Sequence, residues 1–166
     1  MKSQPQSRRD TWIRFLRAGV LTAIVDGLFS SALSVFAYHS TVTRLFQGVA
    51  AALLGSAAFD GGTRTAVVGV LMHVGVAFGW SAVFLLLVSR LPAIRRVVAS
   101  PNGVARTAAL YGPFVWMVMS LAVIPALMHR APAITIRWWI QFFGHIPFVA
   151  VPIVASIGTG PAAARD

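Results

Sequence analysis

Four long apolar stretches constrain this chain more than any other feature of its sequence. They cover residues 17–38, 64–89, 104–128 and 136–158. A helix rises about 1.5 Å per residue, so roughly 20 apolar residues cross the ~30 Å hydrocarbon core of a bilayer. Each stretch is long enough to do so, and a helix satisfies its own backbone hydrogen bonds there. The sequence therefore predicts an all-α integral membrane protein, with four transmembrane helices in a single membrane domain.

A fifth stretch, residues 43–59, is helical in character but shorter than the other four. As a helix it extends only ~25 Å. It contains Gln47 and is followed by the turn sequence Asp60-Gly61-Gly62. A helix that stops inside the bilayer is tolerated only where it packs on protein. We therefore expect residues 43–59 to form a short re-entrant or interfacial helix between the first and second spans.

The distribution of basic residues distinguishes four spans from five. The chain has 14 Lys and Arg residues and four acidic residues, which gives a formal net charge of +10. Four spans place ten of the basic residues on one side of the membrane, whereas five spans place only eight there. Because basic loops stay in the cytoplasm, we expect four spans and two cytoplasmic termini, with residues 1–16 as a basic cytoplasmic segment. The charge is then a topology signal, and we expect no nucleic-acid partner.

Aromatic and basic side chains indicate where the surfaces of the lipid bilayer lie. Tryptophan and tyrosine concentrate at membrane interfaces, so we expect Trp12 at the inner surface. Tyr38, Trp138 and Trp139 are expected at the outer surface. Arginines near the inner surface also attract anionic phospholipid headgroups. The arginines that we expect to do so are Arg8, Arg9, Arg14, Arg17, Arg95 and Arg96.

Composition argues against several kinds of chemistry. The chain has no cysteine, so it forms neither disulfides nor thiolate metal sites. It has no glutamate, and its four aspartates leave little material for paired-carboxylate catalysis. Asp60-Gly61-Gly62-Thr63 is a turn and not a phosphate-binding loop, and no nucleophile has a visible general base. We therefore expect a protein that is not an enzyme and holds no cofactor and no metal.

Small residues recur every four positions in the predicted spans, which places them on one face of each helix. Inside a membrane, small residues let two helix backbones approach closely. Such faces pack helices within one chain, and they also suit a homo-oligomer or another membrane protein as partner. The residues that we expect on these packing faces are Gly27 and Ser31 in the first span, Gly69, Gly75 and Gly79 in the second, and Gly112 in the third.

Three ionisable side chains lie near the middle of the predicted spans. Asp26, His73 and His145 are each about nine residues from a span end, which is within ~5 Å of the midplane. An ionisable group at that depth costs at least a few kcal/mol unless it is paired or hydrated, and such groups are functional by default hypothesis. Gln47 on the short helix and Gln141, one turn before His145, complete a predicted intramembrane polar cluster.

Several segments of the chain resemble a group of small, four-span bacterial inner-membrane proteins of unknown function. They include "RLFQGVAAALLGSAAFDGG", "SRLPAI" and "WIQFFGHIPFVAVPI", and the resemblance covers about residues 30–158. The tail, with "FFGH", is also distantly similar to the YagU-type inner-membrane family. The resemblance implies a multi-pass protein of the bacterial inner membrane and no established activity. The matching positions are Gln47, Gly61, Gly62, His73, Arg90, Pro92, Tyr111, Gly112, Pro125 and His145.

Three functions remain open for the polar cluster. The leading hypothesis is small-solute or proton-linked permeation, because imidazole changes charge between about pH 5 and 8, with Gln47 as a gate. The second is a structural or assembly subunit of a membrane complex, in which His73 and His145 each make one interhelical hydrogen bond. The third is a redox subunit, in which the two histidines bind a b-type haem or join Asp26 at a metal ion.

Overall fold

The structure is a computed structural model, and it describes residues 8–158. Over this range the chain is helical and contains no strand. Three helices continue into a π-helical segment, and one continues into a 3-10 segment. The segments are α1 (Arg8–Ala32) with η1 (Leu33–Ala37), α2 (Val42–Leu54) with η2 (Gly55–Phe59), α3 (Gly62–Arg90), α4 (Pro92–Ala99), α5 (Gly103–Val118) with η3 (Met119–Val123) and α6 (Ile124–Met128), and α7 (Ile136–His145) with η4 (Ile146–Ala150) and α8 (Val151–Gly158).

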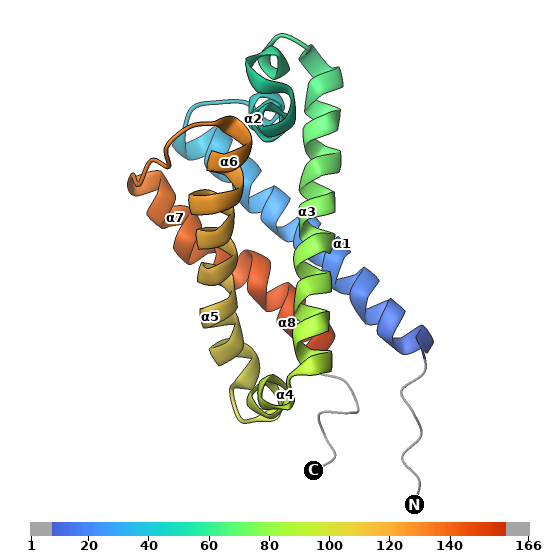
Figure 1. The fold of residues 1–166 in the computed structure, drawn as a ribbon. Helices are drawn as coiled ribbons and strands as arrows, with labels where there is room; N and C mark the ends of the chain where they lie inside the picture. The colour runs from blue at the N-terminus through green and yellow to red at the C-terminus, as the bar shows by residue number, and fades with distance from the viewer. Residues whose placement is uncertain (1–7, 159–166) are drawn as a thin grey trace, which may run out of the picture.

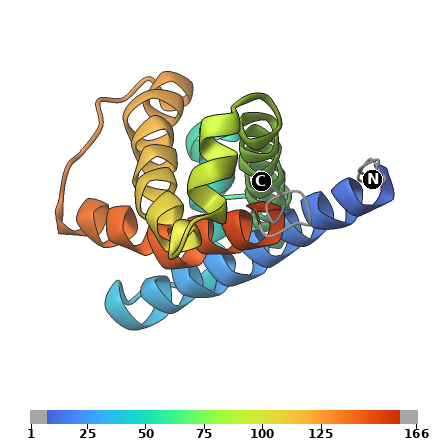
Figure 2. The same ribbon diagram turned by 90° about the horizontal axis from the view of Figure 1, so that it is seen from below.

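Four long helical units run back and forth along the molecule (Figure 1). α3 and the unit α5–α6 run roughly along its length, whereas α1 and the unit α7–α8 cross them obliquely. Figure 2 shows α1 and α7–α8 lying side by side, and both α3 and α8 pack against α1. The short helix α4 lies at one end of the molecule and α2 lies at the other. We refer to these as the α4 end and the α2 end.

α2 lies across the long helices instead of running beside them. Figure 1 views α2 nearly end-on, beside the first half of α3, whereas α3 itself runs along the picture. α1 finishes at the α2 end and α3 starts there, so the segment between them enters and leaves at the same end. The described chain begins and finishes at the α4 end. α2 packs on α3, which agrees with the prediction that this helix rests on protein.

Five helical segments in the described range are long and apolar enough to cross a membrane. The fold is therefore that of an all-α membrane protein, as predicted. By length and composition alone, Val42–Phe59 is among the five, with 18 residues. The four-span prediction left this segment out because of its length and the distribution of charge, and length and composition alone do not exclude it as a span. The other four are Arg8–Ala37, Gly62–Arg90, Gly103–Met128 and Ile136–Gly158.

Two helix boundaries differ from the predictions. α1 begins at Arg8, nine residues before the predicted span, because the apolar stretch marks the hydrocarbon-crossing part and the helix continues beyond it in a basic, polar turn. Residues 90–106 were predicted as a loop but contain α4. Pro92 occupies the first turn of α4. Proline suits this position because a backbone N–H there would have no partner within the helix, and because its fixed φ angle is a helical one. Residues 1–7 of the predicted basic segment lie outside the described residues.

Several predicted packing glycines sit at close helix contacts. A Cβ on Gly69 of α3 would overlap the carbonyl oxygen of Phe46 in α2. A Cβ on Gly112 of α5 would lie 2.6 Å from the carbonyl oxygen of His145. A Cβ on Gly27 would lie 3.4 Å from the imidazole Nε2 of His73. Gly69 and Gly112 thus lie where two backbones approach closely, whereas Gly27 is in ordinary van der Waals contact with His73.

Gly75 and Gly79 pack against nothing in the described chain, so packing at this face within residues 8–158 is not seen. Both are exposed, and a Cβ on either would meet no atom within 4 Å. The four-residue spacing placed them on one face of α3, but α1 and α2 pack on other faces of that helix. Ser31 is half-buried. The main hydrophobic core lies elsewhere and includes the fully buried Phe84, Val115 and Ile153.

Candidate functional site

Asp26 of α1 and His73 of α3 face each other where the two helices cross. The Nδ1 atom of His73 lies 3.9 Å from Oδ2 of Asp26, and each side chain is 16% exposed. Nε2 of His73 lies 3.0 Å from the carbonyl oxygen of Ala23. A carbonyl only accepts, so Nε2 carries a hydrogen and donates it, which leaves Nδ1 as the imidazole atom that can gain a proton. That atom is the one that faces Asp26.

Two buried oxygens beside this pair have no hydrogen-bond partner. They are Oδ1 of Asp26 and Oγ1 of Thr22, which lies one turn earlier on the same face of α1. A buried polar atom left unsatisfied costs about 1–3 kcal/mol, and more when it is charged. Structural polar groups in a folded protein are nearly always satisfied. The unpaired Asp26 oxygen is therefore a feature that packing alone does not explain.

His145 is buried near the same carboxylate. It ends α7 and is 8% exposed. Its Nδ1 donates to the carbonyl oxygen of Gln141 at 2.7 Å, one turn earlier in the same helix. His145 and Asp26 interact electrostatically, as do His73 and Asp26. The structure thus gathers the three predicted ionisable residues around the Asp26 carboxylate, with His73 adjacent to it and His145 farther away.

The two histidines make different kinds of hydrogen bond, one between helices and one within a helix. The assembly hypothesis expected each to make an interhelical hydrogen bond. His73 does so, because it joins α3 to the Ala23 carbonyl of α1. His145 does not, because its hydrogen bond to Gln141 stays within its own helix. A role in tying helices together therefore accounts for His73 better than for His145.

Neighbouring aromatic rings that the sequence analysis missed enclose the histidines. Phe46 of α2 lies against the ring of His73, with centroids 5.9 Å apart. Trp116 of α5 packs on His145, with centroids 4.8 Å apart. The spacing of the packing glycines indicates where both contacts lie, because His73 comes one turn after Gly69 and Trp116 comes one turn after Gly112. The identity of the opposite ring could not be read from that spacing.

Gln47 does not belong to the polar cluster. It is 5% exposed, and its Nε2 donates to the carbonyl oxygen of Gly62 at 3.1 Å. This bond fastens α2 to the start of α3, and Phe46 takes the position facing His73. The prediction that Gln47 lies in the cluster as a gate is therefore wrong. Gln141 joins the site through its backbone carbonyl, while its side chain lines a separate cavity.

The predicted interface residues divide between exposed and buried positions. Trp12 is 61% exposed and Trp139 is 45% exposed, as expected of residues that meet lipid. Trp138 is buried, and its Nε1 donates to Oγ of Ser120 at 2.9 Å. The prediction of a surface role for Trp138 is wrong, since a one-residue step along α7 turns it inward. The ring of Tyr38 lies under the guanidinium of Arg137, 4.1 Å away.

The predicted lipid-binding arginines gather at one end of the molecule. Those on α1 lie in its first three turns, and the other two lie on α4, so both groups are at the α4 end (Figure 1). All except Arg14, which is half-buried, are exposed. The six residues are Arg8, Arg9, Arg14, Arg17, Arg95 and Arg96. Lys2 and Arg165, which also counted toward the predicted inner charge, lie outside the described residues.

The fold and the site define a class: an all-α membrane protein with a carboxylate next to one histidine and within electrostatic range of a second. No family model, curated protein or solved structure matches the chain. In residues 8–158, no three histidine, cysteine or acidic side chains are grouped so that they could hold a metal ion. Function is therefore argued from the geometry of this site.

Proposed function

We propose that this protein is a multi-pass membrane protein that conducts protons, or a small solute with protons, through the cluster of Asp26, His73 and His145. The observation that carries the proposal is the unpaired, buried Oδ1 of Asp26. In a low-dielectric site a carboxylate with a free oxygen is held at a cost, which a proton or a passing solute relieves. A purely structural aspartate would have that oxygen satisfied.

In this proposal the two histidines supply the proton donors and acceptors that exchange with the carboxylate. Nδ1 of His73 faces Asp26, so a proton on Asp26 and a proton on that nitrogen are alternative states of one pair. Nε2 of His145 is free to exchange a proton, because Nδ1 is engaged by Gln141. Imidazole changes charge in the physiological range, which suits such a relay. The proposed order of groups is His145, Asp26 and His73.

The proposed topology has four spans and two cytoplasmic ends, with α2 held at the non-cytoplasmic surface. The oblique position of α2 supports it, as does its entry and exit at one end (Figure 1). The concentration of arginines at the α4 end supports that end as the cytoplasmic one. The resemblance described above suggests the bacterial inner membrane as its location, and the exposed arginines there suit anionic phospholipid headgroups.

This topology predicts the side from which single cysteines react. The chain has no native cysteine, so each variant carries one reactive thiol. His39→Cys and Asp60→Cys flank α2, and we expect an impermeant maleimide to label both from the same, non-cytoplasmic side. Ala99→Cys, at the end of α4, should be labelled only after the membrane is opened. Labelling of His39→Cys and Asp60→Cys from opposite sides would show that α2 spans the membrane.

Proton flux into liposomes tests the proposed function. We expect the purified protein to carry protons into vesicles loaded with a pH-sensitive dye, and Asp26→Asn to reduce the rate to that of protein-free vesicles. The amide keeps the size of the side chain but cannot take up or release a proton. Asp60→Asn is the matched control, because Asp60 is exposed in the turn before α3. Flux that is absent from the wild type, or equal in Asp26→Asn, contradicts the proposal.

One observation favours the alternative of an assembly subunit. Gly75 and Gly79 form an exposed face of α3 that nothing in the described chain covers. Such a face lets a helix of another chain approach closely. This alternative predicts a stable complex and no flux, so the liposome experiment separates the two functions. The third alternative, a haem or metal subunit, is tested by the absorption spectrum and metal content of the purified protein.

A further inference from the structure

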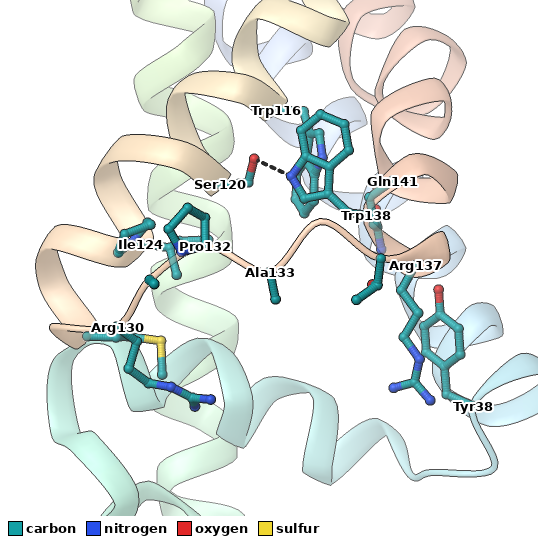
Figure 3. A pocket seen from close by; sticks show the side chains of 14 residues that line it. Tyr38, Trp116, Ser120, Ile124, Arg130, Pro132, Ala133, Arg137, Trp138 and Gln141 are labelled. Atoms are coloured by element: carbon teal, nitrogen blue, oxygen red, sulfur yellow. Dashed lines mark hydrogen bonds between the residues drawn. The ribbon is translucent and has the colours of Figure 1, made fainter.

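A cavity of about 380 Å³ lies at the α2 end, separate from the Asp26 carboxylate. It is an open cavity lined by the end of α6, the loop that follows and the start of α7, with Tyr38 on one side (Figure 3). Its volume is in the range of small-molecule sites. Two arginines, Arg130 and Arg137, line it. The cavity thus holds charges to which neither the fold nor the proposed flux gives a role.

The two ends of this cavity differ in chemistry. Figure 3 shows Arg130 and Arg137 at one end of the cavity, on opposite sides, with the Arg137 side chain beside the Tyr38 ring. The indoles of Trp116 and Trp138 and the hydroxyl of Ser120 lie at the other end. A ligand that fits both ends carries negative charge on one side and an apolar or aromatic body on the other.

The arginines are available to a ligand. Within residues 8–158 the only carboxylates are those of Asp10, Asp26 and Asp60, and none forms a salt bridge with Arg130 or Arg137. Arg137 is held in place, because its guanidinium stacks on the ring of Tyr38 at 4.1 Å. Stacking of this kind leaves the edge of the guanidinium, with its hydrogen-bond donors, free for a planar oxyanion.

Two of the residues that line the cavity have a polar group without a hydrogen-bond partner. The hydroxyl of Tyr38 and Nε1 of Trp116 are buried and lack a hydrogen-bond partner. Both residues line the cavity, and Gln141 adds an amide that can donate or accept. The Tyr38 hydroxyl lies at the arginine end of the cavity and the Trp116 donor at the aromatic end, so a ligand with oxygen acceptors that spans the cavity could satisfy both. No carboxylate lines the cavity to oppose it.

We propose that this cavity binds a small organic anion, with its carboxylate or phosphate between Arg130 and Arg137 and its apolar body against Trp116 and Trp138. The same chemistry is offered by a water-soluble organic acid and by the headgroup of an anionic lipid. This inference goes beyond the proposed proton flux, because binding here requires neither Asp26 nor His73. Trp116 joins the two sites, since it lines the cavity and packs on His145.

Calorimetric titration of the purified full-length protein in a neutral detergent tests the site. The probes are benzoate, for a soluble acid, and dihexanoyl phosphatidylglycerol, for a lipid headgroup. We expect saturable binding of at least one probe, weakened about tenfold or more by Arg137→Gln and by Arg130→Gln, because each removes a charge-assisted hydrogen bond. The probe that binds more tightly identifies the source of the anion.

Arg44→Gln is the matched control. Arg44 also lies at the α2 end with its guanidinium over an aromatic ring, that of Phe59 at 4.3 Å, but it does not line the cavity. Its loss should leave the affinity unchanged. Equal weakening in Arg44→Gln would show general attraction to a basic surface, and absence of binding by both probes would also overturn the proposal. If Arg137→Gln fails to fold, Arg130→Gln carries the test. Asp26→Asn should bind the probe normally, so loss of flux and loss of binding are distinguishable.

Discussion

Replacing Gly69 by alanine is expected to destabilise the protein by about 1–3 kcal/mol, the usual effect of overfilling a packed interior. A Cβ at this position overlaps the carbonyl oxygen of Phe46. That oxygen belongs to the backbone of α2, so relief requires the whole helix to move, not the rotation of one side chain. The free energy of unfolding in mixed detergent micelles measures the effect.

Gly75→Ala is the matched control on the same helix. No atom lies within 4 Å of a Cβ there, and alanine is the better helix former. We therefore expect unchanged or slightly increased stability. Equal losses in the two variants would mean that α2 does not approach α3 as the structure has it. Gly69 lies one turn before His73, so displacement of α2 in Gly69→Ala should also move Phe46 away from the imidazole.

Replacing His145 by phenylalanine is expected to abolish proton flux while lowering the free energy of unfolding by about 1–3 kcal/mol, because phenylalanine is larger than histidine and the position is packed. Phenylalanine can keep the ring contact with Trp116. The hydrogen bond that is lost lies within α7, so no tie between helices is broken. Flux in liposomes and unfolding in micelles, measured on the same preparation, separate the two effects.

Two further variants complete this comparison. His129→Asn is the control for flux, because His129 is exposed and asparagine tolerates its left-handed backbone conformation, φ 50°. It should conduct as the wild type does. His73→Phe should lose both flux and stability, since it breaks the bond to the Ala23 carbonyl of α1. Full flux in His145→Phe would make His145 a packing residue and shorten the proposed relay to Asp26 and His73.

Periodicity predicted much of the fold because it reports which helix faces are small or polar. The close approaches at Gly69 and Gly112 follow directly from that spacing. The same spacing at Gly75 and Gly79 meets no neighbour within residues 8–158, since a small-residue face shows that close packing is possible without showing that a neighbour is present. α4 was missed because eight residues give too little apolar pattern to stand out.

The sequence predicted which ionisable residues make up the candidate site better than it predicted which side chains contact one another there. Depth along each span brought Asp26, His73 and His145 to one level, and the structure brings both histidines within electrostatic reach of the carboxylate. Direction could not be predicted, since a rotation of one residue moves a side chain by about 100° around a helix. That uncertainty placed Gln47 in the cluster and left Phe46 and Trp116 out of it.

The π-helical segments interrupt three of the four long helical units. α3 is α-helical over all its 29 residues, whereas the other three long units each contain a π-helical turn, η1, η3 or η4. Such a turn interrupts the regular hydrogen-bond ladder and is a recognised point of bending. Pro147 lies inside η4, where its missing N–H weakens the ladder further. α3 is thus the one long unit with an unbroken α-helix, and the other three each contain a point at which the helix can bend. His145 is the residue immediately before that point in its own unit.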